Sequence, residues 1–162
     1  MKVLYLFRHA KSNWDDPDVD DFDRTLNNRG EKAAPLMGEA IKDRDIQPDL
    51  ILCSPARRAE QTATLALESA EIETEPIFDE RIYLASASML LSILSERAEK
   101  IESVLLIGHN PGISNLLEML TGKYDEFPTA ALARINLDIK KWRELRRGCG
   151  TLDWILRPKE LS

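Results

Sequence analysis

Short apolar runs alternate along the chain with longer segments in which apolar residues recur at helical spacing. Residues 3–7, 50–53 and 104–107 are apolar without interruption, a pattern typical of strands that are buried on both faces. Apolar positions three and four residues apart predict helices over residues 29–44, 55–69, 86–99 and 111–122. Residues 77–78 are expected to add a short edge strand.

The order strand, turn, helix recurs along the chain and predicts an α/β fold. We expect a three-layer α/β/α sandwich with a largely parallel central sheet. Residues 132–139 and 151–156 show some strand-like alternation and are predicted to be late, more exposed strands. The 162 residues contain no repeat, low-complexity tract or linker. A single domain over residues 1–162 is therefore expected.

The residues before two of the predicted helices favour helix starts. Ser54 precedes Pro55, and Asn110 precedes Pro111. Serine and asparagine accept hydrogen bonds from the first free N–H groups of a helix, and proline suits its first position. We therefore expect Ser54 and Asn110 to be N-caps, with Pro55 and Pro111 as the first helical residues.

Composition and charge narrow the function classes. With 43% hydrophobic and 31% charged residues, the chain is expected to fold, and its net charge of -6 provides no overall positive field for nucleic acid or an anionic membrane. A basic cluster over residues 140–147 is predicted to be a solvated turn. The apolar run at residues 3–7 is too short for a signal peptide or a membrane span. With only Cys53 and Cys149 present, a reducing, cytoplasmic location and free thiols are expected.

Polar residues suited to phosphate binding follow each of the three apolar runs. They are Arg8 and His9 after the first run, Ser54, Arg57 and Arg58 after the second, and Gly108 and His109 after the third. If the three strands are neighbours, these side chains meet beyond the carboxyl ends of parallel strands, where α/β sheets bind ligands. Guanidinium groups and helix N-termini both bind phosphate oxygens. An imidazole in such a site can be a nucleophile, an acid or base, or a donor, and the spacing does not decide between them.

Other interpretations apply to these residues taken singly. Each histidine alone could be a hydrogen-bonded residue at a strand end, and each arginine a solvated surface charge. Their joint placement favours a site. Two histidines without a nearby cluster of carboxylates or thiolates supply too few ligands for an ordinary metal site, so neither a metal nor another cofactor is expected.

Four motifs occur in order along the chain: RHAK at residues 8–11, RTLNNRG at 24–30, SPARRAEQT at 54–62 and GHNPG at 108–112. Together they resemble the signatures of the histidine phosphatase superfamily, which has the phosphoglycerate-mutase-like fold. Ala10 stands where the superfamily usually has glycine, and Thr25 where the second motif has proline. The superfamily's second arginine immediately precedes alanine, which selects Arg58 over Arg57. In its small size the chain is most similar to members of the phosphohistidine phosphatase, or SixA-type, branch.

The resemblance implies a metal-independent phosphatase with defined roles for these residues. It makes His9 the nucleophile, which forms a covalent phosphohistidine that water then hydrolyses. It makes Arg8, Arg58 and a protonated His109 the groups that stabilise the phosphoryl oxygens. Arg24 is expected to be an additional contact to phosphate or substrate.

Glu80 lies where mutases and many phosphatases of the superfamily carry their acid, so it is the candidate proton donor. The alternative is an exposed carboxylate at the end of a strand. An alkoxide leaving group needs a proton, whereas imidazole departs neutral from a protonated phosphoimidazole. The need for Glu80 therefore depends on the substrate.

The loop that carries six aspartates between residues 15 and 23 also invites a calcium interpretation. It fails because Asp21 stands where a calcium loop needs glycine, and Asn27 where it needs glutamate. A solvated acidic loop is expected instead. For Trp14 and Phe22, which flank the loop, core packing is the favoured interpretation and a partner contact is the alternative.

The leading hypothesis is a hydrolase that acts on phosphohistidine in a protein, such as a signalling or phosphorelay domain. The alternatives are a phosphatase of a small phosphate ester, a mutase, and a non-catalytic phosphate-recognition module. A mutase must exclude water with lids, and residues 80–104 leave room for little beyond one helix. An open pocket and hydrolysis are therefore expected, with a phosphohistidine-bearing protein or a small phosphorylated molecule as partner.

Overall fold

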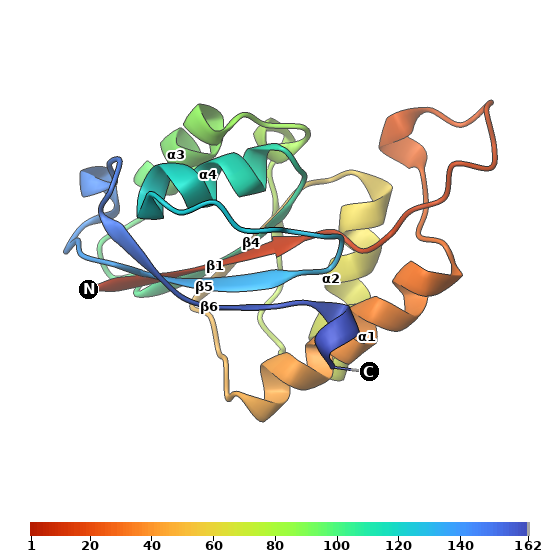
Figure 1. Cartoon of the computed structure of the whole chain (residues 1–162), viewed down its shortest axis with the longest axis horizontal. Helices are drawn as coiled ribbons and strands as arrows, with labels where there is room; N and C mark the ends of the chain where they lie inside the picture. Colours follow the sequence, from red (N-terminus) through yellow and green to blue (C-terminus); the bar gives the residue numbers. More distant parts are fainter. Residues whose placement is uncertain (162) are drawn as a thin grey trace.

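The computed structural model describes residues 1–161 and contains a six-stranded sheet with helices on both faces (Figure 1). The strands are β1 (Lys2–Arg8), β2 (Leu50–Cys53), β3 (Ile77–Phe78), β4 (Ser103–Gly108), β5 (Leu132–Leu137) and β6 (Gly150–Leu156). The α-helices are α1 (Asn28–Asp43), α2 (Arg57–Ser69), α3 (Ala87–Ser95) and α4 (Gly112–Thr121). Short 3-10 helices are η1 (Asp21–Asp23), η2 (Glu80–Ile82), η3 (Trp142–Glu144) and η4 (Pro158–Glu160). The predicted α/β fold is confirmed.

The strand order is β3-β2-β4-β1-β5-β6, with β1, β2, β3 and β4 parallel. β5 runs antiparallel to both of its neighbours, β1 and β6. The prediction that β5 is a more exposed strand was wrong, because neighbours on both sides and a covered face bury most of it. Of the two predicted late strands, only β6, at the edge of the sheet, shows the expected exposure.

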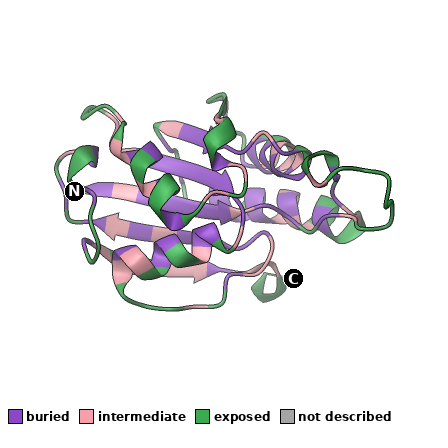
Figure 2. Ribbon diagram, turned by 90° about the horizontal axis from the view of Figure 1, so that it is seen from above, coloured by how far each residue is buried: buried purple, intermediate pink, exposed green. Residues whose placement is uncertain are grey.

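Each face of the sheet packs against its own layer of helices, which explains the uninterrupted apolar runs. Along β1, Leu4 and Leu6 point into the core shared with α3 and α4. Tyr5 and Phe7 point into the core shared with α1 and α2. Successive side chains of a strand face opposite sides, so a strand between two cores must be apolar at every position. The central strands are accordingly buried along most of their length (Figure 2).

The helix α2 starts later than predicted. Its N-cap is Ala56 and its first residue is Arg57, so the expectation that Ser54 is the cap and Pro55 the first helical residue was wrong. Ser54 is fully buried, and its hydroxyl accepts a hydrogen bond from the backbone N–H of Ala56 at 3.2 Å. The serine therefore shapes the turn between strand and helix rather than the helix end.

The helix α4 also starts one residue later than predicted, at Gly112, with Pro111 as N-cap. Asn110 nevertheless accepts a hydrogen bond from the backbone N–H of Ser114 at 3.1 Å through its side-chain oxygen. On the same face, α3 ends at Ser95 rather than at residue 99.

The strand register brings the predicted polar residues to one edge of the sheet. β4 lies between β1 and β2, with Arg8 paired to Gly108 and Cys53 paired to Ile107. The three strands therefore end together, as the phosphate-site prediction required. Within residues 1–161, no helix combines the length and apolar character needed to cross a membrane.

The start of α1 packs tightly on the segment that follows β1. The backbone N–H of Asn27 donates to the carbonyl of Lys11 at 3.0 Å, and the Asn27 side chain accepts from the N–H of Gly30 at 2.9 Å. A Cβ at Gly30 would lie 2.1 Å from the Lys11 carbonyl oxygen. Only glycine permits this approach, which fixes the backbone beside the predicted site.

Candidate active site

A cavity of about 490 Å³ lies beyond the carboxyl ends of β1 and β4. The residues that line it are Arg8, His9, Lys11, Ser12, Trp14, Asp21, Arg24, Arg58, Leu84, His109, Asn110, Pro128 and Thr129. Five of the six predicted site residues are in this lining: Arg8, His9, Arg24, Arg58 and His109. The structure thus brings together residues from four distant motifs.

The environment of His9 fixes the position of its proton. Its Nδ1 lies 2.7 Å from the carbonyl oxygen of Ala10; because a carbonyl can only accept, Nδ1 carries the hydrogen and Nε2 keeps its lone pair. Burial lowers the pKa of His9 to about 4, and the nearby Arg58 and Arg8 guanidiniums act in the same direction against the Ala10 hydrogen bond. His9 is therefore neutral at pH 7, with Nε2 suited to act as a nucleophile.

His109 has the opposite tautomer. Its Nδ1 lies 3.4 Å from Nη2 of Arg58, which can only donate, so the proton is on Nε2 and points to the Ser54 hydroxyl at 2.7 Å. Burial lowers the pKa of His109 to about 3, helped by His9 and Arg58. In this arrangement, without a bound phosphoryl group, His109 is therefore neutral. Since both of its nitrogens have partners, His109 is a weaker nucleophile candidate than His9, whose ring centroid lies 5.1 Å away.

Arg8, which is half-buried, and Arg58, which is buried, each have a buried Nε hydrogen without a partner among the described residues. Nη1 of Arg8 donates to the carbonyl of Phe127 at 2.9 Å, and both terminal nitrogens of Arg58 also have acceptors. The Nε atoms of Arg8 and Arg58, however, are buried with no hydrogen-bond partner among the described residues. Unpaired buried donors cost free energy, which an oxyanion would offset.

The structure also decides between the two adjacent arginines of α2. The Arg58 side chain is only 2% exposed and reaches the cavity, whereas Arg57 points to the surface and pairs with Glu60 at 2.5 Å. Thr62 stabilises the arrangement, because its hydroxyl accepts from the N–H of Ala10 at 2.9 Å and donates to the carbonyl of Arg58 at 2.7 Å. The start of α2 is thereby tied to the segment that carries His9.

Asp21 is a site residue that the sequence reasoning missed. Its carboxylate accepts hydrogen bonds from Arg58 at 3.0 Å, from Arg24 at 3.1 Å and from the hydroxyl of Tyr83 at 2.6 Å. Burial raises the pKa of Asp21, but the hydrogen bonds from Tyr83, Arg58 and Arg24 outweigh it and lower that pKa to about 2. The available signal was its spacing of three residues before Arg24, which the neighbouring aspartates obscured.

A sequence model of the histidine phosphatase superfamily (branch 1) matches residues 4–105. The chain belongs to the histidine phosphatase superfamily. It is thus a phosphatase-type enzyme. A related but uncharacterized protein of Mycobacterium tuberculosis is 30% identical over 156 residues, which cover 90% of this chain and 95% of that protein.

Solved structures of SixA type are among those that this histidine phosphatase matches. A putative phosphohistidine phosphatase SixA from Agrobacterium tumefaciens has a TM-score of 0.84 and 30% identity, with 97% of this chain and 98% of that chain covered. A protein histidine phosphatase SixA complexed with tungstate has a TM-score of 0.85 at 24% identity, with 99% of both chains covered, and shares the fold. A phosphoglycerate mutase of Streptomyces avermitilis is 41% identical over 76 residues, which is 46% of this chain and 30% of the mutase.

In this histidine phosphatase the structure does not bring Glu80 to the site. Glu80 is exposed on η2 and is absent from the cavity lining. It follows β3, the edge strand, which β2 and β4 separate from β1. In this arrangement Glu80 is therefore an exposed carboxylate, as in the alternative interpretation, and is not positioned to donate a proton to a substrate in the cavity.

The favoured interpretation of Trp14 and Phe22 as core residues was also wrong. Trp14 is 74% exposed and Phe22 is 39% exposed, because the loop between β1 and α1 extends beyond the sheet, where no core is within reach (Figure 1). The guanidinium carbon of Arg24 lies 3.4 Å from the centroid of the Trp14 ring, a cation–π contact at the mouth of the cavity. Arg24 also donates to the Ser12 hydroxyl at 2.5 Å.

The cavity has the chemistry of an oxyanion site. Within residues 1–161, no three His, Cys, Asp or Glu side chains come together as a metal site would require. The charged lining instead contains Arg8, Arg24, Arg58 and Lys11, opposed by the carboxylate of Asp21. Excess positive charge beside a neutral imidazole suits binding and transfer of a phosphoryl group.

Proposed function

We propose that this histidine phosphatase hydrolyses phosphohistidine on a protein, through a covalent phosphohistidine intermediate on His9. The observation that carries the proposal is the tautomer of His9, which leaves the Nε2 lone pair beside the guanidiniums of Arg8 and Arg58. Those guanidiniums would stabilise the phosphoryl oxygens as charge shifts during the transfer. Arg24 would add a further cation.

In the first step the Nε2 lone pair of His9 attacks phosphorus, and the bond from phosphorus to the substrate imidazole breaks. A substrate imidazole that is protonated on its other nitrogen leaves as a neutral group and keeps that proton. In the second step water attacks phosphorus, the bond to Nε2 breaks, and His9 returns to its neutral form. The water proton leaves with inorganic phosphate or to solvent. The negative charge of the phosphoryl group would raise the pKa of His109 during these steps. His109, neutral in the structure, could then be protonated and donate a hydrogen bond to a phosphoryl oxygen.

The absence of a protonated carboxylic acid among the residues that line the cavity supports phosphohistidine over an alkyl phosphate. The lining contains a single carboxylate, Asp21, whose low pKa keeps it ionised. An alkoxide leaving group needs a proton donor, whereas the imidazole of a protonated phosphohistidine does not. The same chemistry makes Glu80 dispensable for this substrate.

Two apolar side chains at the mouth of the cavity support a protein-borne substrate. Trp14 and Leu84 are 74% and 56% exposed and line the cavity. Exposed aromatic and aliphatic groups around a polar pocket are typical of protein contacts. The similarity to structures of SixA, one of them in complex with the oxyanion tungstate, agrees with this proposal. A signalling role and a cytoplasmic location are part of the proposal.

A direct test assays the purified chain with EDTA present against a phosphohistidine peptide and a panel of sugar phosphates. We expect turnover of the peptide, and acid-labile phosphate on His9 in rapidly quenched samples by mass spectrometry. Preference for a sugar phosphate would favour the small-ester alternative. Binding of phosphopeptide without turnover would favour a recognition module and contradict the proposal.

A further inference from the structure

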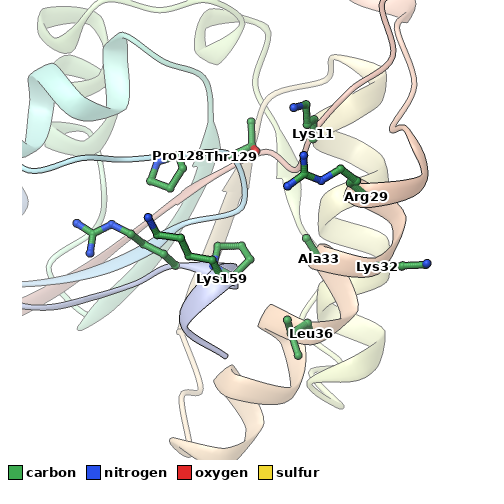
Figure 3. A pocket seen from close by; sticks show the side chains of 10 residues that line it. Lys11, Arg29, Lys32, Ala33, Leu36, Pro128, Thr129 and Lys159 are labelled. Carbon is green, nitrogen blue, oxygen red and sulfur yellow. The ribbon is translucent and has the colours of Figure 1, made fainter. Parts of the chain in front are cut away.

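A second cavity, of about 460 Å³, lies between α1 and the turn of η4. We call it the basic groove. Lys11, Arg29 and Leu36 lie on one side, and Pro128, Thr129 and Lys159 lie opposite (Figure 3). The groove shares Lys11, Pro128 and Thr129 with the cavity around His9, so the two adjoin.

The rim of the basic groove carries cations that have no carboxylate partner among residues 1–161. Lys11, Arg29, Lys32 and Lys159 are all exposed. Within residues 1–161, no carboxylate oxygen lies within 4.0 Å of their side-chain nitrogens. A fifth cation, Arg157, is different because it donates to Asp125 at 2.6 Å. These four cations form a positively charged patch around one groove, although the net charge of the chain is -6.

The lining of the basic groove combines this charge with apolar surface. Ala33 and Leu36 of α1 face the groove together with Pro128 and Pro158. Arg29 points toward the groove, close to these apolar positions, whereas the side chain of Lys32 points away from it (Figure 3). An occupant that carries both carboxylates and an aliphatic side chain complements the lining better than a small inorganic anion does.

The backbone at the junction of the two cavities is held in place. The carbonyl of Lys11 accepts from the N–H of Asn27 and packs against Gly30 at the start of α1. His9 lies two residues earlier. A chain segment in the basic groove would therefore lie at a defined position relative to a phosphoryl group at His9.

We propose that the basic groove binds an acidic segment of the phosphorylated protein substrate, a segment that also carries an apolar side chain. The inference rests on the proposed function and deepens it. The groove selects proteins that present such a segment beside their phosphohistidine. Charge pairs along the rim give specificity and speed of association, and the shared wall directs the phosphohistidine into the cavity around His9.

The test uses two synthetic phosphohistidine peptides that differ only in the residues flanking the phosphohistidine. One has glutamates and a leucine on both sides, and the other has serines at the same positions. We expect the value of kcat/KM to be about tenfold higher for the acidic peptide, from several exposed charge pairs of modest strength. The preference should shrink as salt is raised, since exposed charges are screened.

The variant Arg29→Glu/Lys159→Glu should reduce this preference to less than about threefold, because it reverses two of the charges that line the groove. It leaves the residues around His9 unchanged, so turnover of the serine peptide should stay at the wild-type value. The matched control is Lys140→Glu/Arg143→Glu, which changes the net charge equally at exposed positions outside the groove. This control should keep the preference.

If an active wild-type enzyme has equal kcat/KM values for the two peptides, the proposal that the groove binds an acidic segment is wrong. The proposed function is then unaffected. A parallel measurement does not depend on turnover: fluorescence anisotropy with the unphosphorylated acidic peptide. Binding that the Arg29→Glu/Lys159→Glu variant weakens, and the control does not, supports the groove as the binding site of the acidic segment. If neither phosphopeptide is hydrolysed, the proposed function fails, while the anisotropy result still decides for or against the groove.

Discussion

The carboxylate of Asp21 and the guanidinium of Arg58 form an ion pair at the cavity around His9, with Oδ2 3.0 Å from Nη2. The main-chain oxygen of Asp21 also accepts from Nη1 of Arg58 at 2.6 Å. The buried arginine is thereby oriented by a residue of η1, which lies far away in the sequence. Nη1 and Nη2 are also the nitrogens with which an arginine binds phosphate. Asp21 therefore positions Arg58 and, through its charge, also opposes a second anion there.

Removing the charge of Asp21 should strengthen oxyanion binding. In Asp21→Asn we expect the inhibition constant of tungstate to fall by about three- to tenfold, since one negative charge beside the anion site is lost. The measurement is competitive inhibition of phosphohistidine peptide hydrolysis. Asp23→Asn is the matched control, because Asp23 is an exposed residue of the same η1 outside the cavity lining. Weaker tungstate binding in Asp21→Asn would mean that orientation of Arg58 outweighs the charge effect.

The two histidines should differ sharply in their roles. His9→Ala should abolish turnover and the trapped phosphoenzyme, because no other side chain of the cavity offers a free imidazole lone pair. His109→Ala or Arg58→Ala should lower kcat by about a hundredfold, the usual loss of a preorganised donor. Rapid-quench labelling with a radioactive phosphohistidine peptide measures both effects. A labelled protein in the His9→Ala variant would contradict the assignment of the nucleophile.

The lowered pKa values of the histidines predict how stability depends on pH. In the unfolded chain a histidine has a pKa of about 6.5, whereas folding lowers the pKa of His9 to about 4 and that of His109 to about 3. As pH falls below 6.5, the unfolded chain takes up protons that the folded chain does not. The free energy of unfolding should therefore fall between pH 7 and pH 5.

Urea denaturation at pH 7 and pH 5 measures this loss, and a His9→Asn/His109→Asn variant is the control. Carboxylates with lowered pKa values, such as Asp21, titrate below this window. The variant should therefore lose less stability than the wild type across the same interval. An equal loss in both proteins would show that the histidines do not cause it.

The parts of the fold that were predictable are those with local physical causes. The apolar runs of β1, β2 and β4 reflect burial on two faces, and the polar residues after them converge because these strands are neighbours. The helix starts at Ser54 and Asn110 were misplaced because residues at the strand ends form tertiary contacts. Ser54, for example, bonds to His109 instead of capping α2.

The missed parts of the site depend on contacts between distant segments. Asp21 meets Arg58 across 37 positions of sequence and Tyr83 across 62. Nothing in the run of aspartates distinguishes the one that folds back onto the cavity. Glu80 was a candidate only by resemblance, because no local feature shows which side chain after β3 turns to the cavity; Tyr83 reaches Asp21 and Leu84 lines the cavity instead.

The chemistry of the leaving group should decide which phosphate monoesters the enzyme hydrolyses. Asp21, the sole carboxylate of the cavity lining, is ionised, and the two nitrogens of His109 face Ser54 and Arg58, so no side chain of the lining is positioned to protonate an alkoxide. A phosphate monoester should therefore react at a rate set by the stability of its leaving group. We expect p-nitrophenyl phosphate to be hydrolysed at least about a hundredfold faster than an alkyl phosphate, which is the low end of what general acid catalysis supplies when it is present.

Glu80→Gln is the decisive variant for this prediction, because Glu80 is exposed and lies outside the lining. Its kcat/KM should match that of the wild type for a phosphohistidine peptide, for p-nitrophenyl phosphate and for an alkyl phosphate. All three rates are measured on the same preparations, with Glu75→Gln as a control for loss of a surface charge. A loss of more than about tenfold on the alkyl phosphate alone would mean that η2 moves Glu80 to the substrate as a general acid. The ester would then be a competent substrate, and the argument from the leaving group to phosphohistidine would fail.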